Sequence, residues 1–343
     1  MDDAIFTVMT VPAPAVSPAQ AAAVAQAEWG IAGAARLLTG ERDSNFRLTA
    51  DDGREFVLKF ANPAETPEVV DMQIRALAHI AARDPGLPVP RMIALPDGRI
   101  ETVVDGVRVR LLSWLPGLPL RDAPRSAAQR VACGAALARL GLALQGFAHP
   151  ASATPLIWDL THTARLREVL DTLEPAEARA EITAVLDAFD TEVAPIRPRL
   201  RSQVLYNDMN VGNTLVQPDA PEVVAGIIDF GDVVETAVVI DLAVGATSQL
   251  AHGVDVAAAM GDFVGGYHRL RPLLAEEVAV LPLLTACRLS MSLVLQAWHR
   301  ATHPHNPHYR SIPATEMQRR LAAIAAVQAP ETMTAIRRAC GLD

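Results

Sequence analysis

The sequence predicts an α+β protein with a small β-rich N-terminal lobe and a larger, mostly helical C-terminal lobe. Short apolar runs separated by turn signals fill the first part of the chain, and long segments rich in alanine and leucine fill the rest. A connector rich in proline and glycine, LPGLPLRD (115–122), separates the two parts. A chain of 343 residues is also long for one core. We therefore expect two lobes, residues 1–113 and 114–343.

The N-terminal part predicts an antiparallel sheet of about five strands with one main helix. AQAAAVAQAEWG (19–30) is a short helix closed by Gly30 after an extended arm. The main helix spans residues 66–83, with Val69, Met72, Ala76, Leu77 and Ile80 on one face. The strand candidates are ARLLTG (35–40), NFRLTA (45–50), REFVLKFA (54–61), RMIALP (91–96), GRIETVVDG (98–106) and VRVRLLSWL (107–115).

The C-terminal part predicts helices around one short β insertion. QVLYNDMNVGNTLVQP (203–218) and EVVAGIIDFGD (222–232) form a hairpin-like pair with polar loops. The helical segments are residues 126–147, 159–173, 176–193, 239–252, 254–270, 276–303 and 314–328.

Composition limits the class of protein. The net charge of −9 and the absence of a Lys/Arg run argue against a nucleic-acid partner. Cys133, Cys287 and Cys340 are far apart, so we expect no disulfide framework or structural zinc site, and buried free thiols at the first two positions. The acidic N-terminus and the lack of an uncharged apolar stretch of about 18 residues predict a cytoplasmic protein without a membrane span. The oligomeric state stays open.

Four polar residues form a pattern that suits phosphoryl transfer. This chemistry needs oxygen ligands for a divalent cation, a carboxylate for the attacking hydroxyl, and a cation on the phosphates. Asp208 follows the apolar strand QVLY, Asn213 returns from the same loop, and Asp229 ends the strand VAGIID. Lys59 lies in the strand FVLKF, where burial of its charge requires an anionic partner.

Each residue also has a simpler interpretation when it is taken alone. Asp208 and Asn213 could form turns, and Asp229 could cap a helix. Lys59 could be a strand-end residue whose ammonium reaches solvent. Their joint occurrence in this order favours the catalytic interpretation.

These motifs resemble the aminoglycoside phosphotransferase and choline kinase superfamily, which has a two-lobed protein-kinase-like fold. The resemblance rests on ERDSNFRL, FVLKFANPAE, VDMQIRALAHI, YNDMNVGNTLV and IDFGD, and spans residues 27–300. The N-terminal lobe is most similar to hydroxylysine kinase and its bacterial relatives.

The resemblance implies a role for each matching position. Asp208 is the expected catalytic base, Lys59 binds the α- and β-phosphates, and Asn213 and Asp229 bind Mg²⁺. The turn at Asp43, Ser44 and Asn45 covers the nucleotide phosphates. Main-chain groups from Leu112 to Leu115, including Ser113 and Trp114, hold the base. Asp241 braces the catalytic loop.

The chain departs from the family pattern at several positions. Tyr206 stands where the family usually has His, in a position that supports the loop, and Asn207 replaces the commoner Gly. The nucleotide turn ERDSN contains no glycine. Gln73 stands where a Glu usually pairs with the lysine, so we expect Lys59 to pair with Asp229, with the nucleotide, or with one of the nearby acids Glu65, Glu68 and Asp71.

Further polar and aromatic residues allow two interpretations each. His299, His303, His305 and His308 resemble a metal cluster, but no acid accompanies them and the segment is rich in proline, so a metal site is disfavoured. Trp158, Tyr267 and Trp298 could line a substrate pocket or pack in the core, and the core is favoured. Asp232, Glu235 and Asp262 are candidates for an acidic pocket that binds an ammonium group.

The resemblance predicts a Mg²⁺-dependent kinase that transfers the γ-phosphate of ATP or GTP to a hydroxyl of a small amino-bearing molecule, similar to hydroxylysine. Homoserine, choline, ethanolamine and an aminoglycoside are alternative acceptors on the same fold. A nucleotide-binding pseudokinase is the alternative from another class, supported by Tyr206 and Gln73.

Overall fold

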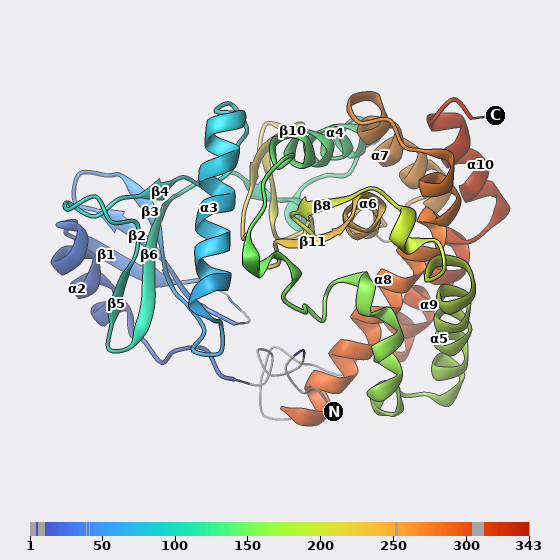
Figure 1. Ribbon diagram of the computed structural model, residues 1–343, viewed down its shortest axis with the longest axis horizontal. Coiled ribbons are helices and arrows are strands. Elements are labelled where there is room, and N and C mark those ends of the chain that lie inside the picture. The colour runs from blue at the N-terminus through green and yellow to red at the C-terminus, as the bar shows by residue number, and fades with distance from the viewer. Residues whose placement is uncertain are drawn as a thin grey trace.

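The N-terminal part of the computed structural model is a six-stranded antiparallel sheet with the strand order β1-β2-β3-β6-β4, in which β5 also pairs with β6 (Figure 1). The structure describes residues 5, 11–38, 40, 42–250, 253–303 and 312–342. Each of the six predicted strand segments overlaps a strand. Their bounds are β1 (Gly33–Leu37), β2 (Ser44–Ala50), β3 (Glu55–Phe60), β4 (Met92–Ile93), β5 (Thr102–Val104) and β6 (Val107–Ser113).

Two helices cover the sheet. In α2 (Pro18–Trp29), Ser17 forms a capping box with Gln20, and Gly30 ends the helix with a φ of +68°. The second helix, α3 (Pro67–Arg83), lies between the sheet and the helical lobe (Figure 1). Of the predicted buried face, Met72, Ala76, Leu77 and Ile80 are buried, whereas Val69 is not; Val70, Gln73 and Ile74 are buried in addition.

The helical lobe contains several long apolar helices and one short helix that the sequence did not predict. Residues 176–188 are α-helical and continue through a π-helical turn to Val193, as expected. The unpredicted helix is α10. The α-helices of this lobe are α4 (Ala127–Ala143), α5 (Ala176–Ala188), α6 (Val238–Thr247), α7 (Val256–Leu270), α8 (Ala275–Thr302), α9 (Ala314–Val327) and α10 (Pro330–Ala339).

The α-helix predicted over residues 159–173 is wrong. The segment forms two 3₁₀-helices, Leu160–Glu168 and Leu170–Thr172. Asp159 accepts hydrogen bonds from the Thr161 N–H at 3.0 Å and from the Thr236 hydroxyl at 2.8 Å. This anchor ties the start of the segment to a distant strand, a tertiary contact that periodicity cannot reveal.

Two small sheets in the helical lobe refine the predicted hairpin. β9 (Thr214–Gln217) pairs with β10 (Ala220–Ile227) as expected, and also with β7 (Leu118–Pro119). The first half of the predicted pair, β8 (Ser202–Leu205), pairs instead with β11 (Val234–Ala237). The chain therefore passes twice between the two small sheets, once through residues 206–213 and once through residues 228–233.

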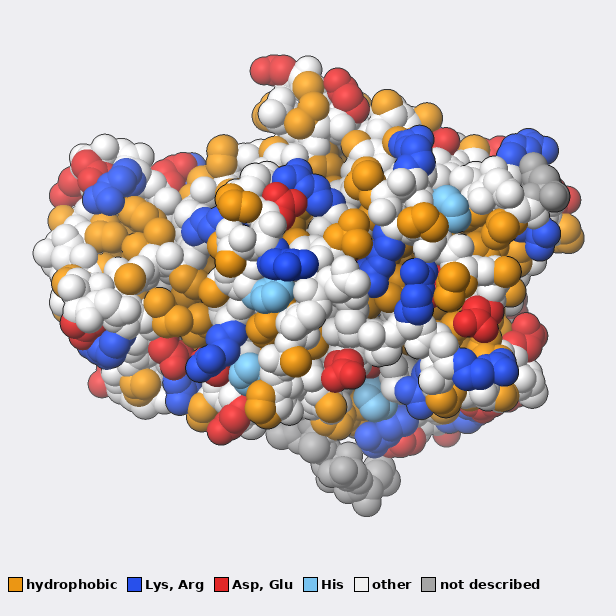
Figure 2. All heavy atoms as spheres, turned by 45° about the horizontal axis from the view of Figure 1, so that its top comes forward, with side chains coloured by type: hydrophobic (Ala, Val, Ile, Leu, Met, Phe, Trp, Pro, Cys, Tyr) orange, Lys and Arg blue, Asp and Glu red, His pale blue; other side chains and the backbone are white. Residues whose placement is uncertain are grey.

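The helix α8 passes a length and hydropathy test for a membrane span, but 83% of its apolar window is buried in the protein. Such burial identifies a core helix. The three cysteines are buried free thiols, as expected for Cys133 and Cys287, and burial raises the pKa of Cys133 to about 11. On the face drawn in Figure 2, basic and acidic side chains are scattered among apolar and neutral ones.

Helices α4 and α7 approach each other closely through glycines. A Cβ atom on Gly134 would lie 1.9 Å from the Phe263 carbonyl oxygen, and one on Gly266 would lie 2.1 Å from the Val131 carbonyl oxygen. A Cβ on the neighbouring Gly265 would make an ordinary contact, 3.4 Å from the Cβ of Ala339. Only glycine at positions 134 and 266 therefore allows this helix pair to pack so tightly.

We expect Gly266→Ala to lower the free energy of unfolding by about 1–3 kcal/mol, because the two helices must separate to admit the methyl group. Gly265→Ala is the matched control, and the helix propensity of alanine should stabilise it by up to about 1 kcal/mol. Urea unfolding of both variants and the wild type measures the difference. Equal stability of the two variants would contradict the close approach.

Candidate active site

Two loops form the floor of a cleft between the lobes. Because β8 pairs with β11 and β9 with β10, the loops 206–213 and 228–233 lie side by side. The cleft has a volume of about 880 Å³ and is lined by the sheet, the connector and both loops. Its lining includes these residues with a predicted catalytic, metal-binding or nucleotide-binding role: Asp43, Asn45, Lys59, Gln73, Leu112, Ser113, Trp114, Leu115, Asp208, Asn213 and Asp229.

Lys59 has two anionic partners across the cleft. Its ammonium lies 3.2 Å from Asp229 Oδ1 and 3.3 Å from Asp43 Oδ2, and the residue is 8% exposed. Burial alone would lower the pKa of Lys59, but the carboxylates of Asp229 and Asp43 outweigh it and raise the pKa. Lys59 in turn lowers the pKa of Asp229 to about 2 against the effect of burial. The expected pairing of Lys59 with Asp229 is confirmed, and Asp43 is an additional partner.

Gln73 makes contacts other than the one that the resemblance implies. Its carbonyl oxygen accepts a hydrogen bond from Arg110, and its amide nitrogen lies 3.5 Å from Glu65 Oε2 and from the Gly231 carbonyl. Lys59 takes its partners from the nucleotide turn and the Asp229 loop instead. The positions of residues along α3 could not predict these partners of Lys59, because the pairing of β2 with β3 brings Asp43 to Lys59.

The nucleotide turn presents a different set of side chains from the expected one. Side chains alternate along β2, so that Asn45 lines the cleft while Ser44 lies on the opposite face. The Ser44 hydroxyl donates to the Pro14 carbonyl at 2.6 Å, contrary to its expected place on the phosphates. Arg42, at the same turn, lines the cleft and forms an ion pair with Asp232. The sequence interpretation did not single out Arg42.

Residues 113–115 line the cleft, and the N–H groups of the first two already donate hydrogen bonds to main-chain carbonyls of the N-terminal lobe. The Ser113 N–H donates to the Arg91 carbonyl at 2.9 Å, and the Trp114 N–H donates to the Glu55 carbonyl at 3.2 Å. The guanidinium of Arg47 lies 4.4 Å from the centre of the Trp114 ring. A nucleotide base at this edge would therefore be held by carbonyl groups or by the main chain of Leu115.

Two buried side chains fix the loop that carries Asp208. The Tyr206 hydroxyl donates to the Ile228 carbonyl of the neighbouring loop, and its ring lies 5.0 Å from that of Phe230. Asn207 has a φ of +61°, and its N–H donates to Asp241 Oδ1 at 2.7 Å. Burial raises the pKa of Asp241 to about 7, although the hydrogen bond from Asn207 opposes this. These contacts support the expected bracing by Tyr206 and Asp241.

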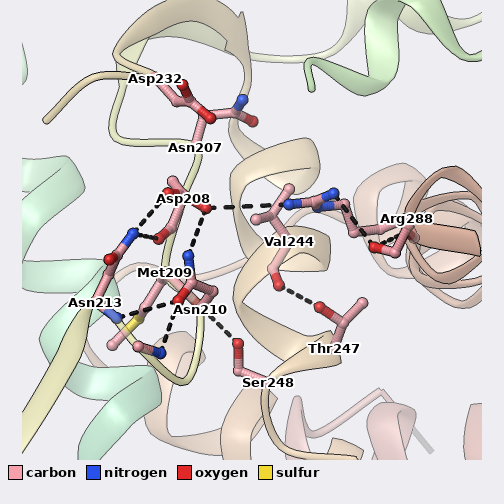
Figure 3. Close-up of polar contacts among 12 residues, drawn as sticks. Asn207, Asp208, Met209, Asn210, Asn213, Asp232, Val244, Thr247, Ser248 and Arg288 are labelled. Carbon is pink, nitrogen blue, oxygen red and sulfur yellow. Dashed lines mark hydrogen bonds and ion pairs between the residues drawn. The ribbon is translucent and has the colours of Figure 1, made fainter. Parts of the chain in front are cut away.

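Asp208 lies at the centre of a polar cluster, as Figure 3 shows. Its Oδ2 accepts a hydrogen bond from the Asn213 amide at 2.6 Å, and its Oδ1 accepts one from the Asn210 amide at 2.9 Å. Arg288 of α8 lies 4.0 Å from Oδ1, on the side away from Asn213 (Figure 3). Burial and the carboxylate of Asp232 raise the pKa of Asp208 well above its ordinary range, which makes it a better proton acceptor.

The donor atoms near Asp208 suit magnesium bound together with a nucleotide. Among the described residues, no group of three or more His, Cys, Asp and Glu side chains could hold a metal ion alone. The carboxylate of Asp229 and the amide of Asn213 are hard oxygen donors of the kind that Mg²⁺ uses when phosphates and water complete its shell. Two protein ligands are therefore sufficient for this type of site.

The expected acidic pocket does not assemble in the cleft. Asp232 lines the cleft, but it pairs with Arg42. Glu235 accepts a hydrogen bond from Ser152 at 3.0 Å, and Asp262 pairs with Arg130 at 2.7 Å between α7 and α4. Neither of the last two lines the cleft.

The aromatic candidates divide between the core and the cleft. Tyr267 and Trp298 pack in the core, as favoured, whereas Trp158 lines the cleft beside Arg288. His299 is buried, and burial lowers its pKa to about 4. His305 and His308 lie outside the described residues.

We expect Asp241→Ala to lower kcat by about 10²-fold because the Asn207 N–H loses its acceptor and Asp208 shifts. Asp241→Asn keeps an acceptor oxygen of the same shape and should restore most of the activity. Steady-state kinetics of both variants, with the nucleotide KM as a second readout, measures the effect. Equal loss in the Ala and Asn variants would show that the charge, and not the acceptor, holds the loop.

The chain is similar to known kinases over most of its length. A hydroxylysine kinase from Mus musculus is 28% identical over an aligned length of 329 residues, and the alignment covers 88% of this chain and 87% of that protein. A homoserine kinase from Rhodospirillum rubrum is 29% identical over 306 residues, covering 86% and 89% of the two chains.

Solved structures share the fold. A microcompartment-associated aminopropanol kinase has a TM-score of 0.69 at 19% identity and covers 93% of this chain and 97% of its own. A spectinomycin phosphotransferase in complex with ADP and spectinomycin has a TM-score of 0.65 at 12% identity, with coverage of 96% and 100%. The two-lobed protein-kinase-like fold is thereby confirmed.

The phosphotransferase enzyme family matches residues 34–273. This range includes the sheet, the connector and both loops of the cleft floor. The chain belongs to the phosphotransferase enzyme family and is a small-molecule kinase.

Proposed function

We propose that this kinase transfers the γ-phosphate of Mg²⁺-bound ATP or GTP to a hydroxyl of a small amino-bearing acceptor similar to hydroxylysine. The observation that carries the proposal is the position of Asp208, whose carboxylate is held by two amides on the floor of the cleft. Lys59 and Asp229 lie in the same cleft, where a phosphate chain and its cation would bind.

Each side chain has a defined task in this reaction. Lys59 would bind the α- and β-phosphates, and Asn213 and Asp229 would hold the cation, which would supply charge neutralisation on the phosphates. Asp208 orients the acceptor hydroxyl and accepts its proton. The acceptor oxygen forms a bond to the γ-phosphorus as the bond from that phosphorus to the leaving nucleotide oxygen breaks.

The named relatives support a hydroxylated amine as the acceptor. Hydroxylysine kinases and homoserine kinases are both similar to this chain over most of its length. Choline, ethanolamine and an aminoglycoside remain alternative acceptors on the same fold. The choice between ATP and GTP and a cytoplasmic location remain expectations of the sequence.

A pseudokinase has little physical support. Tyr206 and Gln73, the two departures that favoured it, both make structural contacts that leave the catalytic side chains in place. The four residues that phosphoryl transfer requires line one cleft. Loss of catalysis usually removes at least one of them.

We expect Asp208→Asn to lower kcat by about 10²–10⁴-fold with little change in nucleotide affinity, because the amide cannot accept the hydroxyl proton. Nucleotide consumption with Mg²⁺ and either ATP or GTP, across 5-hydroxylysine, homoserine, choline, ethanolamine and an aminoglycoside, measures transfer. The exposed Asp122→Asn provides a matched control. Full activity of Asp208→Asn would eliminate the base assignment, and nucleotide binding without transfer to any acceptor would favour the pseudokinase.

A further inference from the structure

Arg42 extends from the nucleotide turn across the cleft to the helical lobe. Its guanidinium forms an ion pair with Asp232, which belongs to the same loop as Asp229. A Cβ atom placed on Gly231 would lie 2.9 Å from Arg42 Nη2 and 3.3 Å from Asp229 Oδ1. The guanidinium and the carboxylate that would hold the cation therefore border the same point of the cleft. Arg42 thus lies on the side of the cleft where the phosphates would bind.

The main chain of the nucleotide turn is fastened to the sheet, and the Arg42 side chain leaves it toward the cleft. The buried Asn62 donates from its N–H to Asp43 Oδ1 at 2.9 Å and from its side-chain amide to the Arg42 carbonyl at 3.0 Å. Glycine-rich loops bind phosphates through main-chain N–H groups that approach closely. The turn ERDSN contains no glycine. Arg42 can supply from this turn, with its side chain, the contact that such loops make with their main chain.

Two explanations account for the ion pair with Asp232. The pair could be a fixed tie between the lobes, or Asp232 could hold Arg42 until a phosphate replaces it. A tie outside the cleft joins Arg139 of α4 to Asp84 at the end of α3, through Nε at 2.5 Å and Nη2 at 2.7 Å. Arg42 is joined to Asp232 through Nη2. A guanidinium held through one nitrogen can direct its other N–H groups at a second anion.

The exposure of the two partners also favours exchange. The Arg42 side chain is 17% exposed and lines the cleft, whereas the Asp232 side chain is 5% exposed. A ligand in the cleft can therefore reach the arginine without moving the aspartate. Burial would lower the pKa of Arg42, but the carboxylates of Asp232, Glu65 and Asp229 raise it, so the guanidinium keeps its charge.

We propose that Arg42 is a catalytic residue that donates hydrogen bonds to the γ-phosphate of the bound nucleotide, and that Asp232 is its partner before the nucleotide binds. The guanidinium neutralises charge on the non-bridging oxygens while the γ-phosphorus passes from the leaving nucleotide oxygen to the acceptor hydroxyl. Arg42 forms no covalent bond and keeps its protons, so the balance of the transfer is unchanged. The assignment rests on the proposed function and adds to it a residue that contacts the transferred group.

Nucleotide binding tests the assignment without an acceptor. AMP-PNP with ADP, and GMP-PNP with GDP, are pairs that differ in the γ-phosphoryl group. We expect the full-length protein with Mg²⁺ to bind the triphosphate analogue of at least one pair more tightly than the diphosphate. Arg42→Gln should lower the affinity for that analogue by about 10–100-fold and leave the affinity for the diphosphate unchanged. Isothermal titration calorimetry measures both.

Variants of the two partners separate the explanations. Arg42→Gln and Asp232→Asn both break the ion pair, so a tie between the lobes predicts the same loss of affinity in both. If a phosphate replaces Asp232, Asp232→Asn removes a competing anion and should bind the analogue at least as tightly as the wild type. Arg42→Lys keeps the charge without the planar geometry and should recover part of the affinity. Arg139→Gln, which breaks the tie outside the cleft, is the matched control and should keep the wild-type ratio of affinities.

Kinetics give a second readout. We expect Arg42→Gln to lower kcat by about 10³-fold with any acceptor that the wild type uses, because an arginine on a transferred γ-phosphate contributes on this scale. Thermal unfolding checks that each variant is folded.

The outcomes distinguish this assignment from the proposed function. An equal loss of affinity for both nucleotides of a pair in Arg42→Gln, or the same loss in Asp232→Asn, would overturn the assignment in favour of a tie between the lobes. Equal binding of both members of each pair by the wild type would also overturn it. A γ-phosphate preference that Arg42→Gln removes, without transfer to any acceptor of the wider panel, would support the assignment and overturn the proposed function.

Discussion

The ion pair between Lys59 and Asp229 is the interaction on which the arrangement of the cleft depends. Lys59 belongs to the sheet of the N-terminal lobe and Asp229 to a loop of the helical lobe, so their contact fixes one lobe against the other. A buried lysine without a counter-charge would be unstable, and Asp43 supplies a second carboxylate. The pairing of β8 with β11 and of β9 with β10 holds the Asp229 loop beside the Asp208 loop. One charge contact and two strand pairings thus assemble the cleft floor.

Local patterns predicted much of the fold. The apolar alternation of the strands, the C-terminal cap Gly30 of α2 and the periodicity of α3 are encoded within short windows, and these elements form near the expected residues. The prediction of an α-helix over residues 159–173 failed because Asp159 accepts a hydrogen bond from Thr236, far along the chain. The partner of β8 was missed for a similar reason, since a hairpin is the nearest pairing but not the one that the fold uses.

In the candidate site too, residues with a local sequence signal were predicted, and residues placed by tertiary contacts were missed. Motif spacing predicted that Asp208, Asn213 and Asp229 share one site, and the structure places them in one cleft, because Asp208 and Asp229 follow the strands β8 and β10 and Asn213 directly precedes β9. Ser44 was misplaced, since one residue of strand alternation decides which face a side chain occupies. Arg288 could not be found from sequence, because a single arginine in an apolar helix has no local signal for its position beside a loop eighty residues earlier.

Arg42 pairs with Asp232, and Lys59 pairs with Asp43 and Asp229, so these two cations of the cleft are already neutralised by the chain's own carboxylates. An incoming phosphate chain would therefore replace these carboxylates as the anionic partner of Lys59 or Arg42. A nucleotide that arrived alone would take Lys59 from Asp229 and place its phosphates beside a carboxylate that has lost its counter-charge. In the proposed reaction, a magnesium ion that accompanied the nucleotide would remove this repulsion. Nucleotide and metal would then be thermodynamically linked in this cleft, and each would strengthen the binding of the other by the same factor.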